Sequence, residues 1–176
     1  LSLLLDCAEA QFDLICCNGR YGLNVCSLGV DARIGTAIGR YKRLPFVSGS
    51  GAYVLSTVVE VLKGVHEPYR IVLNGQVLDG EKTMIYMTNG RYYGGGFHPV
   101  PDANPADGLL DVLLVAPVSR LKVAAVVGKY KNGLYREYPE LITHYRCDRV
   151  EIHCGREAEI NLDGELLRGR DVTVTV

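Results

Sequence analysis

The chain has 176 residues, of which 48% are hydrophobic and 22% charged, and its formal net charge is −1. This length suffices for one domain with its own core, and the composition is that of an ordinary globular domain. Charges of both signs are spread along the chain, so charge alone does not favour nucleic acid or an anionic bilayer as a partner. We therefore expect a single domain over residues 1–176, no nucleic-acid partner, and chemistry confined to local sites.

The most apolar stretches, residues 52–62 and 109–118, are far shorter than the ~20 residues that a membrane-spanning helix needs. Residues 1–5 lack the basic lead and the cleavage site of a signal peptide, and the first residue is not Met. These features predict a cytoplasmic piece of a longer protein. The six cysteines have no zinc-knuckle spacing and are expected to be reduced, small apolar side chains. They are Cys7, Cys16, Cys17, Cys26, Cys147 and Cys154.

Several segments alternate between apolar and polar residues, which is the pattern of half-buried β-strands. They are residues 12–17, 69–73, 83–88, 109–115, 149–154, 158–162 and 171–176. Asn-Gly or Asp-Gly pairs punctuate them at residues 18–19, 74–75, 79–80, 89–90, 107–108 and 163–164. Such pairs favour tight hairpins, because Asn, Asp and Gly accept the left-handed backbone conformation. The sequence therefore predicts antiparallel sheets.

Two segments have helical spacing instead. Residues 50–63 carry apolar side chains at helical intervals. Residues 119–132 have Ser119 as the expected N-cap and Gly133 as the expected end. The stripe expected to be buried there comprises Leu121, Ala124 and Val127, with Ala125 beside them. A weaker helical pattern covers residues 31–42. The predicted fold is mainly β, a distorted antiparallel β-sandwich or barrel with two or three flanking helices.

No nucleotide-binding motif is readable in the chain, because it has neither a P-loop nor a GxGxxG sequence after a strand. The HExxH signature is also absent, and the four histidines are scattered. By itself this sequence gives no motif that would cradle a nucleotide.

Three segments stand out by their order. The first is NVCSLGVDA at residues 24–32, and the third is LDGE at residues 162–165. The second runs from NGRYYGGG at residues 89–96 through Pro101 to NPADGLLD at residues 104–111. Their order and spacing resemble the C-terminal domain of the bacterial diacylglycerol kinase family, which includes related lipid kinases and is similar to the sphingosine kinases. The resemblance extends from about residue 13 to residue 176.

The resemblance implies one half of a two-domain enzyme. In the family an α/β domain binds ATP through a Gly-Gly-Asp-Gly-Thr loop, which this chain lacks, and a β-sandwich domain lies across the cleft. The family reaction transfers the γ-phosphoryl group of ATP to a lipid hydroxyl with Mg²⁺. The chain would then be the substrate-side domain, with diacylglycerol as the expected acceptor. Alone it should be inactive, because phosphoryl transfer depends on positioning and charge neutralisation across the cleft.

The expected partners are a lipid substrate at the membrane surface and the protein's own N-terminal nucleotide-binding domain. This implies a cytoplasmic protein that is peripheral to the membrane. Exposed sheet edges would also suit an edge-to-edge homodimer.

The glycine triplet Gly94, Gly95 and Gly96 is a candidate cofactor-binding segment. Three successive glycines carry a large entropy cost, which suggests that a ligand or another backbone approaches closely. The alternative is a bulge or a loop without ligand. By the resemblance, residues 24–32 face the cleft between the domains. The alternative for that segment is a strand that leads into a helix.

By the resemblance, Asp107 and the main-chain oxygens of Asn104 and Leu109 form a structural Mg²⁺ site. Oxygen ligands of this kind suit hard divalent cations. The alternative is an Asx-type turn before the next strand.

The tetrapeptide Leu-Asp-Gly-Glu occurs at residues 78–81 and again at 162–165. The resemblance assigns catalysis to the second copy, with Asp163 as the general base on the lipid hydroxyl and Glu165 as its supporting carboxylate. If the preceding strand continued, Asn161, Asp163 and Glu165 would share one face. The first copy is expected to be an ordinary hairpin turn.

Two other functions remain open at this point. The chain could be a lipid- or partner-binding module that keeps the fold without phosphoryl transfer. It could also belong to a kinase of the same superfamily with another acceptor, such as phosphatidylglycerol or a sphingoid base.

Overall fold

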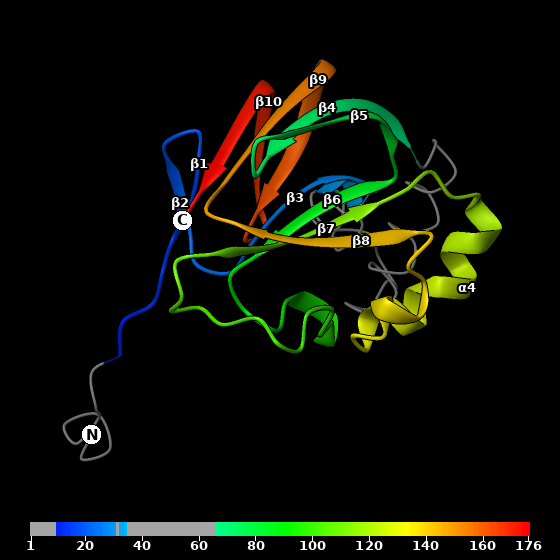
Figure 1. Ribbon diagram of the computed structural model, residues 1–176, viewed down its shortest axis with the longest axis horizontal. Helices are drawn as coiled ribbons and strands as arrows, with labels where there is room; N and C mark the ends of the chain where they lie inside the picture. Colours follow the sequence, from blue (N-terminus) through cyan, green and yellow to red (C-terminus); the bar gives the residue numbers. More distant parts are fainter. Residues whose placement is uncertain (1–9, 31, 35–65) are drawn as a thin grey trace, which may run out of the picture.

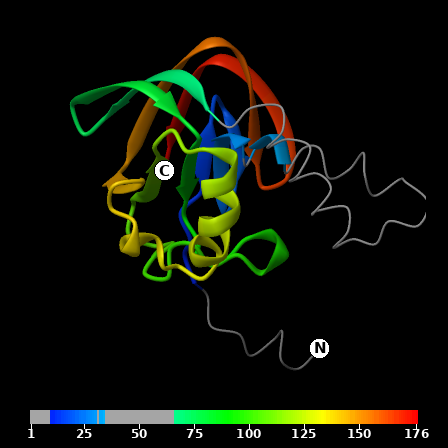
Figure 2. The same ribbon diagram turned by 90° about the vertical axis from the view of Figure 1, so that its right-hand side faces the viewer.

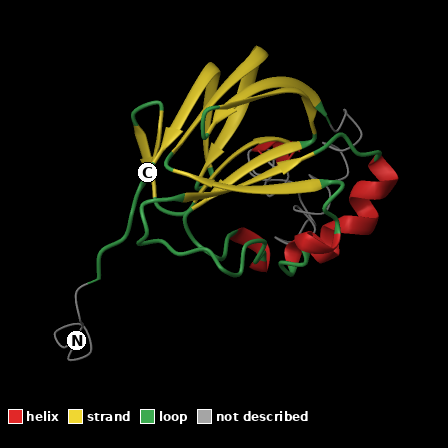
Figure 3. Cartoon of the chain, in the orientation of Figure 1, coloured by secondary structure: helices red, strands yellow, loops and turns green. Residues whose placement is uncertain are grey.

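The computed structural model describes residues 10–30, 32–34 and 66–176. In these residues ten strands form one antiparallel sheet (Figures 1 and 3). The strands are β1 (Ile15–Cys17), β2 (Arg20–Gly22), β3 (Val25–Gly29), β4 (Glu67–Leu73), β5 (Gln76–Lys82), β6 (Met84–Thr88), β7 (Leu110–Val115), β8 (Ile142–Cys147), β9 (Arg149–Leu162) and β10 (Glu165–Thr175). Their order is β2-β1-β10-β9-β3-β6-β7-β8, and the β4–β5 hairpin branches from β9.

The 14-residue strand β9 divides this sheet into two layers. Along one edge it pairs with β10, with a shift of register between Gly169 and Asp171. Along the other edge its first half pairs with β4 and its last residues pair with β3. Figure 1 shows β4, β5, β9 and β10 crossing over β3, β6, β7 and β8. The predicted mainly-β, sandwich-like fold is therefore confirmed.

Two apolar cores lie on opposite faces of β6 and β7. Ile85 and Met87 belong to the larger core, which is shared with β1, β4, β9 and β10. Met84 and Tyr86, on the other face of β6, belong to a second core. That second core also contains Tyr130 of α4 (Arg120–Lys131). Because side chains alternate across a strand, a strand that is buried on both faces is largely apolar, as β6 and β7 are.

Three of the predicted turn pairs close hairpins, at residues 18–19, 74–75 and 163–164. Every residue of these pairs has a positive φ, as the turn type requires. The prediction of a turn at Asp79-Gly80 is wrong, because both residues lie inside β5. Pairing of β4 with β5 runs without interruption from the Asn74-Gly75 turn to Lys82, so no second turn is possible there.

The sequence pattern missed β2, β5 and β8, predicted β3 only in the alternative interpretation of segment 24–32, and divided β9 into two strands. β5 is mostly exposed and carries polar residues on both faces, so it shows no alternation. β3 is the opposite case, since it is buried throughout and has no polar face. Helical backbone follows β3 at residues 30 and 32–34, so segment 24–32 begins as the strand-to-helix unit of the alternative interpretation.

The predicted ends of α4 are confirmed. The Ser119 side chain accepts a hydrogen bond from the Lys122 amide at 3.3 Å, and Gly133 follows the helix with a φ of 75°. The predicted buried stripe is wrong at Leu121, which is 85% exposed, whereas Val127 lies at the apolar pocket between the helix and the sheet. Val123, Val126 and Tyr130 face the sheet instead, and Figure 2 shows the helix in front of the strands. Valine and alanine occur on most sides of this helix, so apolar spacing alone did not select a face.

The helix predicted over residues 50–63 and most of that over 31–42 lie outside the described residues. Within the described ranges, no helix combines the length and the hydropathy needed to cross a bilayer. The cysteines described, from Cys16 to Cys154, are free thiols, as expected. Burial raises the pKa of both Cys147 and Cys154 to about 11, which keeps these thiols protonated.

Candidate functional site

Asp163 lies in the two-residue turn that joins β9 to β10. Its φ is 50° and that of Gly164 is 96°, so both residues adopt the left-handed conformation. The side chain of Asn161 accepts a hydrogen bond from the Gly164 amide at 2.8 Å and supports the turn. The sequence favours this geometry, since Asp-Gly is a preferred pair for such hairpins.

Three consecutive amides hold the carboxylate of Asp163. The Leu23 amide donates to Oδ2 at 2.5 Å, and the Val25 amide donates to Oδ1 at 2.7 Å. The Asn24 amide donates to both oxygens, at 3.2 and 3.1 Å. A carboxylate offers about four acceptor positions, and these four contacts engage both of its oxygens. The side chain is exposed yet fixed in place.

The expectation that Asn161, Asp163 and Glu165 line one face of a continuing strand is wrong. The strand ends at Leu162, and Asp163 and Gly164 form the turn. Glu165 begins β10 opposite Leu162 and is exposed. The structure therefore places Glu165 two residues from Asp163 but gives it no part in the cradle of amides.

The other Leu-Asp-Gly-Glu copy has a different environment. Asp79 lies in β5 across from Arg70, and their side chains form an exposed ion pair at 3.4 Å. No amide cradle is described around Asp79. Identical tetrapeptides thus occupy a strand in one place and a hairpin turn in the other.

The glycine triplet forms a short 3-10 helix, η1 (Gly94–Gly96). Tyr93 and Phe97 close it by a backbone bridge, with the Tyr93 amide 3.0 Å from the Phe97 oxygen. A Cβ atom placed on Gly94 or Gly96 would meet no heavy atom within 4 Å in the described structure. Open space therefore lies beside these two glycines, and the triplet is a tight turn with an exposed flank.

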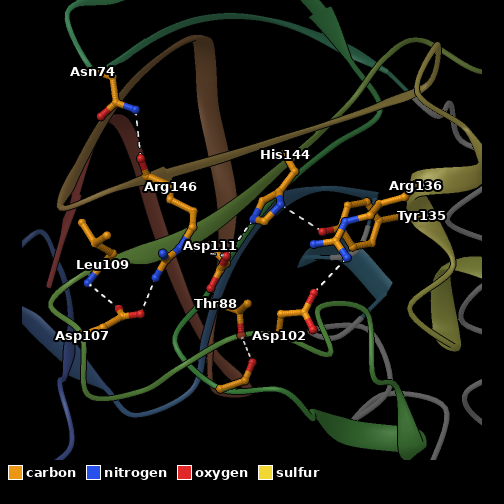
Figure 4. A network of polar contacts seen from close by, with 11 residues as sticks. Asn74, Thr88, Asp102, Asp107, Leu109, Asp111, Tyr135, Arg136, His144 and Arg146 are labelled. Carbon is orange, nitrogen blue, oxygen red and sulfur yellow. Dashed lines mark hydrogen bonds and ion pairs between the residues drawn. The ribbon is translucent and has the colours of Figure 1, made fainter.

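Asp107 is engaged by protein groups. Its Oδ1 accepts the Leu109 amide at 3.1 Å, and its Oδ2 pairs with the guanidinium of Arg146 (Figure 4). The Asn104 side chain accepts the Ala106 amide at 3.3 Å. These are Asx-type turns, the alternative noted for this loop. In the described residues no three His, Cys, Asp or Glu side chains gather as metal ligands. A cation at Asp107 would have to displace Arg146.

A second polar network, which the sequence did not predict, lies beside this loop (Figure 4). His144 bridges Asp111 and Tyr135. Its Nε2 atom lies 2.7 Å from the Asp111 carboxylate, and its Nδ1 atom lies 2.9 Å from the Tyr135 hydroxyl. Burial raises the pKa of the Tyr135 hydroxyl. The side chain of Asp111, the other partner of His144, is 4% exposed. The Nε atom of Arg146 lies 3.5 Å from Asp111 and connects the network to Asp107.

An apolar pocket of about 90 Å³ lies between α4 and the sheet. Val123, Val126 and Tyr130 of the helix line one side of it. Met84 and Val115 of the sheet line the other. Among the described residues around it, Lys122 alone is charged. A pocket of this composition suits a hydrocarbon ligand.

The fold and the site together define an antiparallel, sandwich-like domain that has an apolar pocket and an anchored carboxylate. The family model for the YegS C-terminal NAD kinase beta sandwich-like domain matches residues 24–176. The chain belongs to this family, which confirms the resemblance inferred from the three segments.

Relatives that carry the provisional name of lipid kinase occur in Staphylococcus. The protein of S. carnosus strain TM300 is 25% identical over 165 residues, which cover 93% of this chain and 53% of that protein. The protein SAS0691 of S. aureus strain MSSA476 is 24% identical over 163 residues, with the same coverage. This chain therefore spans about half the length of the curated relatives that it matches.

Solved structures named as diacylglycerol kinases of Bacillus anthracis strain Sterne have the same fold. One, provisionally named, superposes with a TM-score of 0.69 at 24% identity and covers 95% of this chain and 53% of its own. Another superposes with a TM-score of 0.60 at 19% identity and covers 94% of this chain and 51% of its own. At these identities the likeness establishes the fold.

Proposed function

We propose that this chain is the substrate-side domain of an ATP-dependent lipid kinase, and that the acceptor is the hydroxyl group of diacylglycerol. In this proposal a nucleotide-binding domain supplies ATP from across a cleft, and the complete protein works in the cytoplasm at the membrane surface. Asp163 is the general base and Glu165 its supporting carboxylate. Gly94, Gly95 and Gly96 face the bound nucleotide or the other domain. The names of the relatives support the reaction class.

The observation that carries the proposal is the apolar pocket under α4. It is lined almost entirely by hydrocarbon side chains, so a polar metabolite would lose its hydration there without compensation. An acyl chain would instead bury apolar surface, which is favourable by about 25 cal/mol per Å². Lys122 lies at the pocket and is exposed, where it would suit the polar end of a lipid.

The pocket and the Asp163 hairpin lie at opposite ends of β3. The Val25 amide donates to Asp163, whereas Val30 lines the pocket. The five residues of β3 span about 16 Å, since a strand rises about 3.3 Å per residue. A long lipid could thus place its hydroxyl at the hairpin and its tail beneath the helix. Tyr93 and Phe97 also line the pocket, so η1 lies between these two places.

Filling the pocket should impair use of a long-chain acceptor. In the complete two-domain protein, Val126→Trp is expected to raise the KM for long-chain diacylglycerol by about 10-fold or more, the effect of losing roughly 1.4 kcal/mol of binding. The KM for ATP should stay unchanged. The measurement is the rate of phosphatidic acid formation as the diacylglycerol content of detergent micelles is varied.

The matched control is Leu121→Trp, which adds the same side chain to the same helix at an exposed position. It should leave both KM values near those of the wild type. If Val126→Trp and Leu121→Trp behave alike, the pocket does not bind the acceptor.

We also propose that the loop around Asp107 holds a structural Mg²⁺ ion, with the main-chain oxygens of Asn104 and Leu109 as further ligands. Since Arg146 pairs with the same carboxylate, ion and guanidinium should compete. Millimolar Mg²⁺ should therefore raise the melting temperature of the wild type, and that of Arg146→Ala more strongly, because an ion that binds only the folded state stabilises it. Asp107→Ala should not respond. An equal rise in melting temperature in the wild type and in Asp107→Ala would show that Asp107 does not bind the ion.

A further inference from the structure

The three segments that stood out in the sequence meet at Asn24, the residue before β3. Its amide donates to the carboxylate of Asp163 at 3.2 and 3.1 Å. Its carbonyl accepts the Asn89 amide at 2.9 Å and the Thr88 hydroxyl at 3.0 Å. Its side-chain Nδ2 donates to the Tyr92 carbonyl. One residue thus contacts both the hairpin and the strand end that leads into η1.

The side chain of Asn24 also explains the glycine at position 90. A Cβ atom on Gly90 would lie closer to Asn24 Oδ1 than two such atoms can approach. Gly90 is not among the residues with positive φ, so its backbone does not itself call for glycine. Glycine is favoured at position 90 for reasons of space, because the side-chain carboxamide of Asn24 lies directly against the main chain of Gly90.

The main-chain N–H of Asn24 and its side-chain carboxamide have different functions in this arrangement. The main-chain bond to Asp163 is possible with any residue except proline at position 24. The bond from Nδ2 to Tyr92 requires the side chain, and it fixes the distance between the hairpin and the residues that precede Gly94. Loss of the side chain should therefore leave the cradle of Asp163 formed but less well placed.

We propose that Asn24 is a positioning residue, whose side chain holds the Tyr92–Gly94 end of η1 in register with Asp163. The proposal rests on the function proposed above, since it presumes that Asp163 lies at the reaction centre. The acceptor hydroxyl must approach Asp163 while the nucleotide side approaches from across the cleft. A displacement of about 1 Å between the two can lower turnover by about 100-fold.

The test uses the complete two-domain protein with ATP, Mg²⁺ and diacylglycerol micelles. Asn24→Ala should lower kcat by about 10-fold or more, within the range that misplacement produces, while the KM values for ATP and lipid stay near those of the wild type. Gly90→Ala should lower kcat similarly, since its methyl group displaces the Asn24 side chain. In the double variant the smaller alanine side chain at position 24 leaves room for that methyl group. The decrease in kcat of the double variant should then be no greater than that of Asn24→Ala alone.

Asn74→Ala is the matched control. The Asn74 side chain donates to the Arg146 carbonyl at 2.9 Å, so it makes the same kind of bond between distant segments, away from Asp163. Asn74→Ala should lower the melting temperature as Asn24→Ala does, yet keep kcat. A normal kcat in Asn24→Ala, additive losses in the double variant, or an equal loss in Asn74→Ala would overturn the positioning role.

The outcomes also separate this inference from the proposed function. A wild-type protein that transfers no phosphate, or a fully active Asp163→Asn variant, would refute the proposed function and the inference together. A slow Asp163→Asn variant beside a normal Asn24→Ala variant would refute the inference alone.

Discussion

Replacing Asp163 with Asn in the complete two-domain protein is expected to lower turnover by at least about 100-fold, the lower end of what general-base assistance contributes. Asparagine has almost the same shape but cannot accept a proton at neutral pH. Its amide group would also present hydrogen atoms to the three main-chain donors at residues 23–25, so one oxygen position of the cradle would be lost.

The matched control for this change is Asp79→Asn, in the other Leu-Asp-Gly-Glu sequence. Within the described part of the chain, Asp79 forms an exposed ion pair with Arg70, and such pairs contribute about 0–1 kcal/mol to stability. It should keep near-normal turnover. The measurement is the initial rate of phosphatidic acid formation, beside the melting temperature of each variant. Near-normal rates in both variants, or a larger loss from Asp79→Asn, would show that catalysis is wrongly assigned to Asp163.

Replacing His144 with Ala is expected to lower the free energy of unfolding by about 2–3 kcal/mol, because it removes a hydrogen-bond partner of the buried Asp111 carboxylate. His144 is the closest partner of the Asp111 carboxylate, at 2.7 Å, and also binds the buried Tyr135 hydroxyl. Without the imidazole, Asp111 keeps the more distant Arg146, at 3.5 Å.

Urea unfolding of the variants measures this loss. His153→Ala is the matched control, because His153 also pairs with an aspartate, Asp171, at 2.8 Å, but both side chains are largely exposed. Its loss should stay below about 1 kcal/mol. Tyr135→Phe should fall between the two, at about 1 kcal/mol, since it removes one neutral hydrogen bond. Equal losses in His144→Ala and His153→Ala would mean that the network does not stabilise the fold.

The local rules of turns and strands predicted much of the fold. Asn74-Gly75 and Asp163-Gly164 close hairpins because their backbone preferences match the turn. The same rule was wrong at Asp79-Gly80, where the register set by the Asn74-Gly75 hairpin carries the pair into a strand. A local preference therefore yields to long-range pairing when the two conflict. The prediction of the buried face of α4 was wrong for a related reason, because the position of the sheet determines which side of the helix is buried.

The candidate site was predictable in part, through the order of its segments. Family resemblance selected Asp163 over Asp79, and the structure adds the amides that hold Asp163. Nothing in the sequence indicated that Asn24 joins the three segments, because its partners lie 64 to 139 residues away. His144 was treated as one scattered histidine for the same reason, since Asp111 is 33 residues distant in sequence. Contacts of this kind exist only once the sheet has formed.

The most direct test is transfer of labelled phosphate from ATP to diacylglycerol, measured as phosphatidic acid in micelles with Mg²⁺. We predict product from the complete two-domain protein and none above background from this 176-residue chain alone. Product from the isolated chain would contradict the assignment of ATP binding to the other domain. If the complete protein binds the lipid but forms no product, the proposed kinase activity is contradicted, and a lipid-binding module of the same fold is favoured.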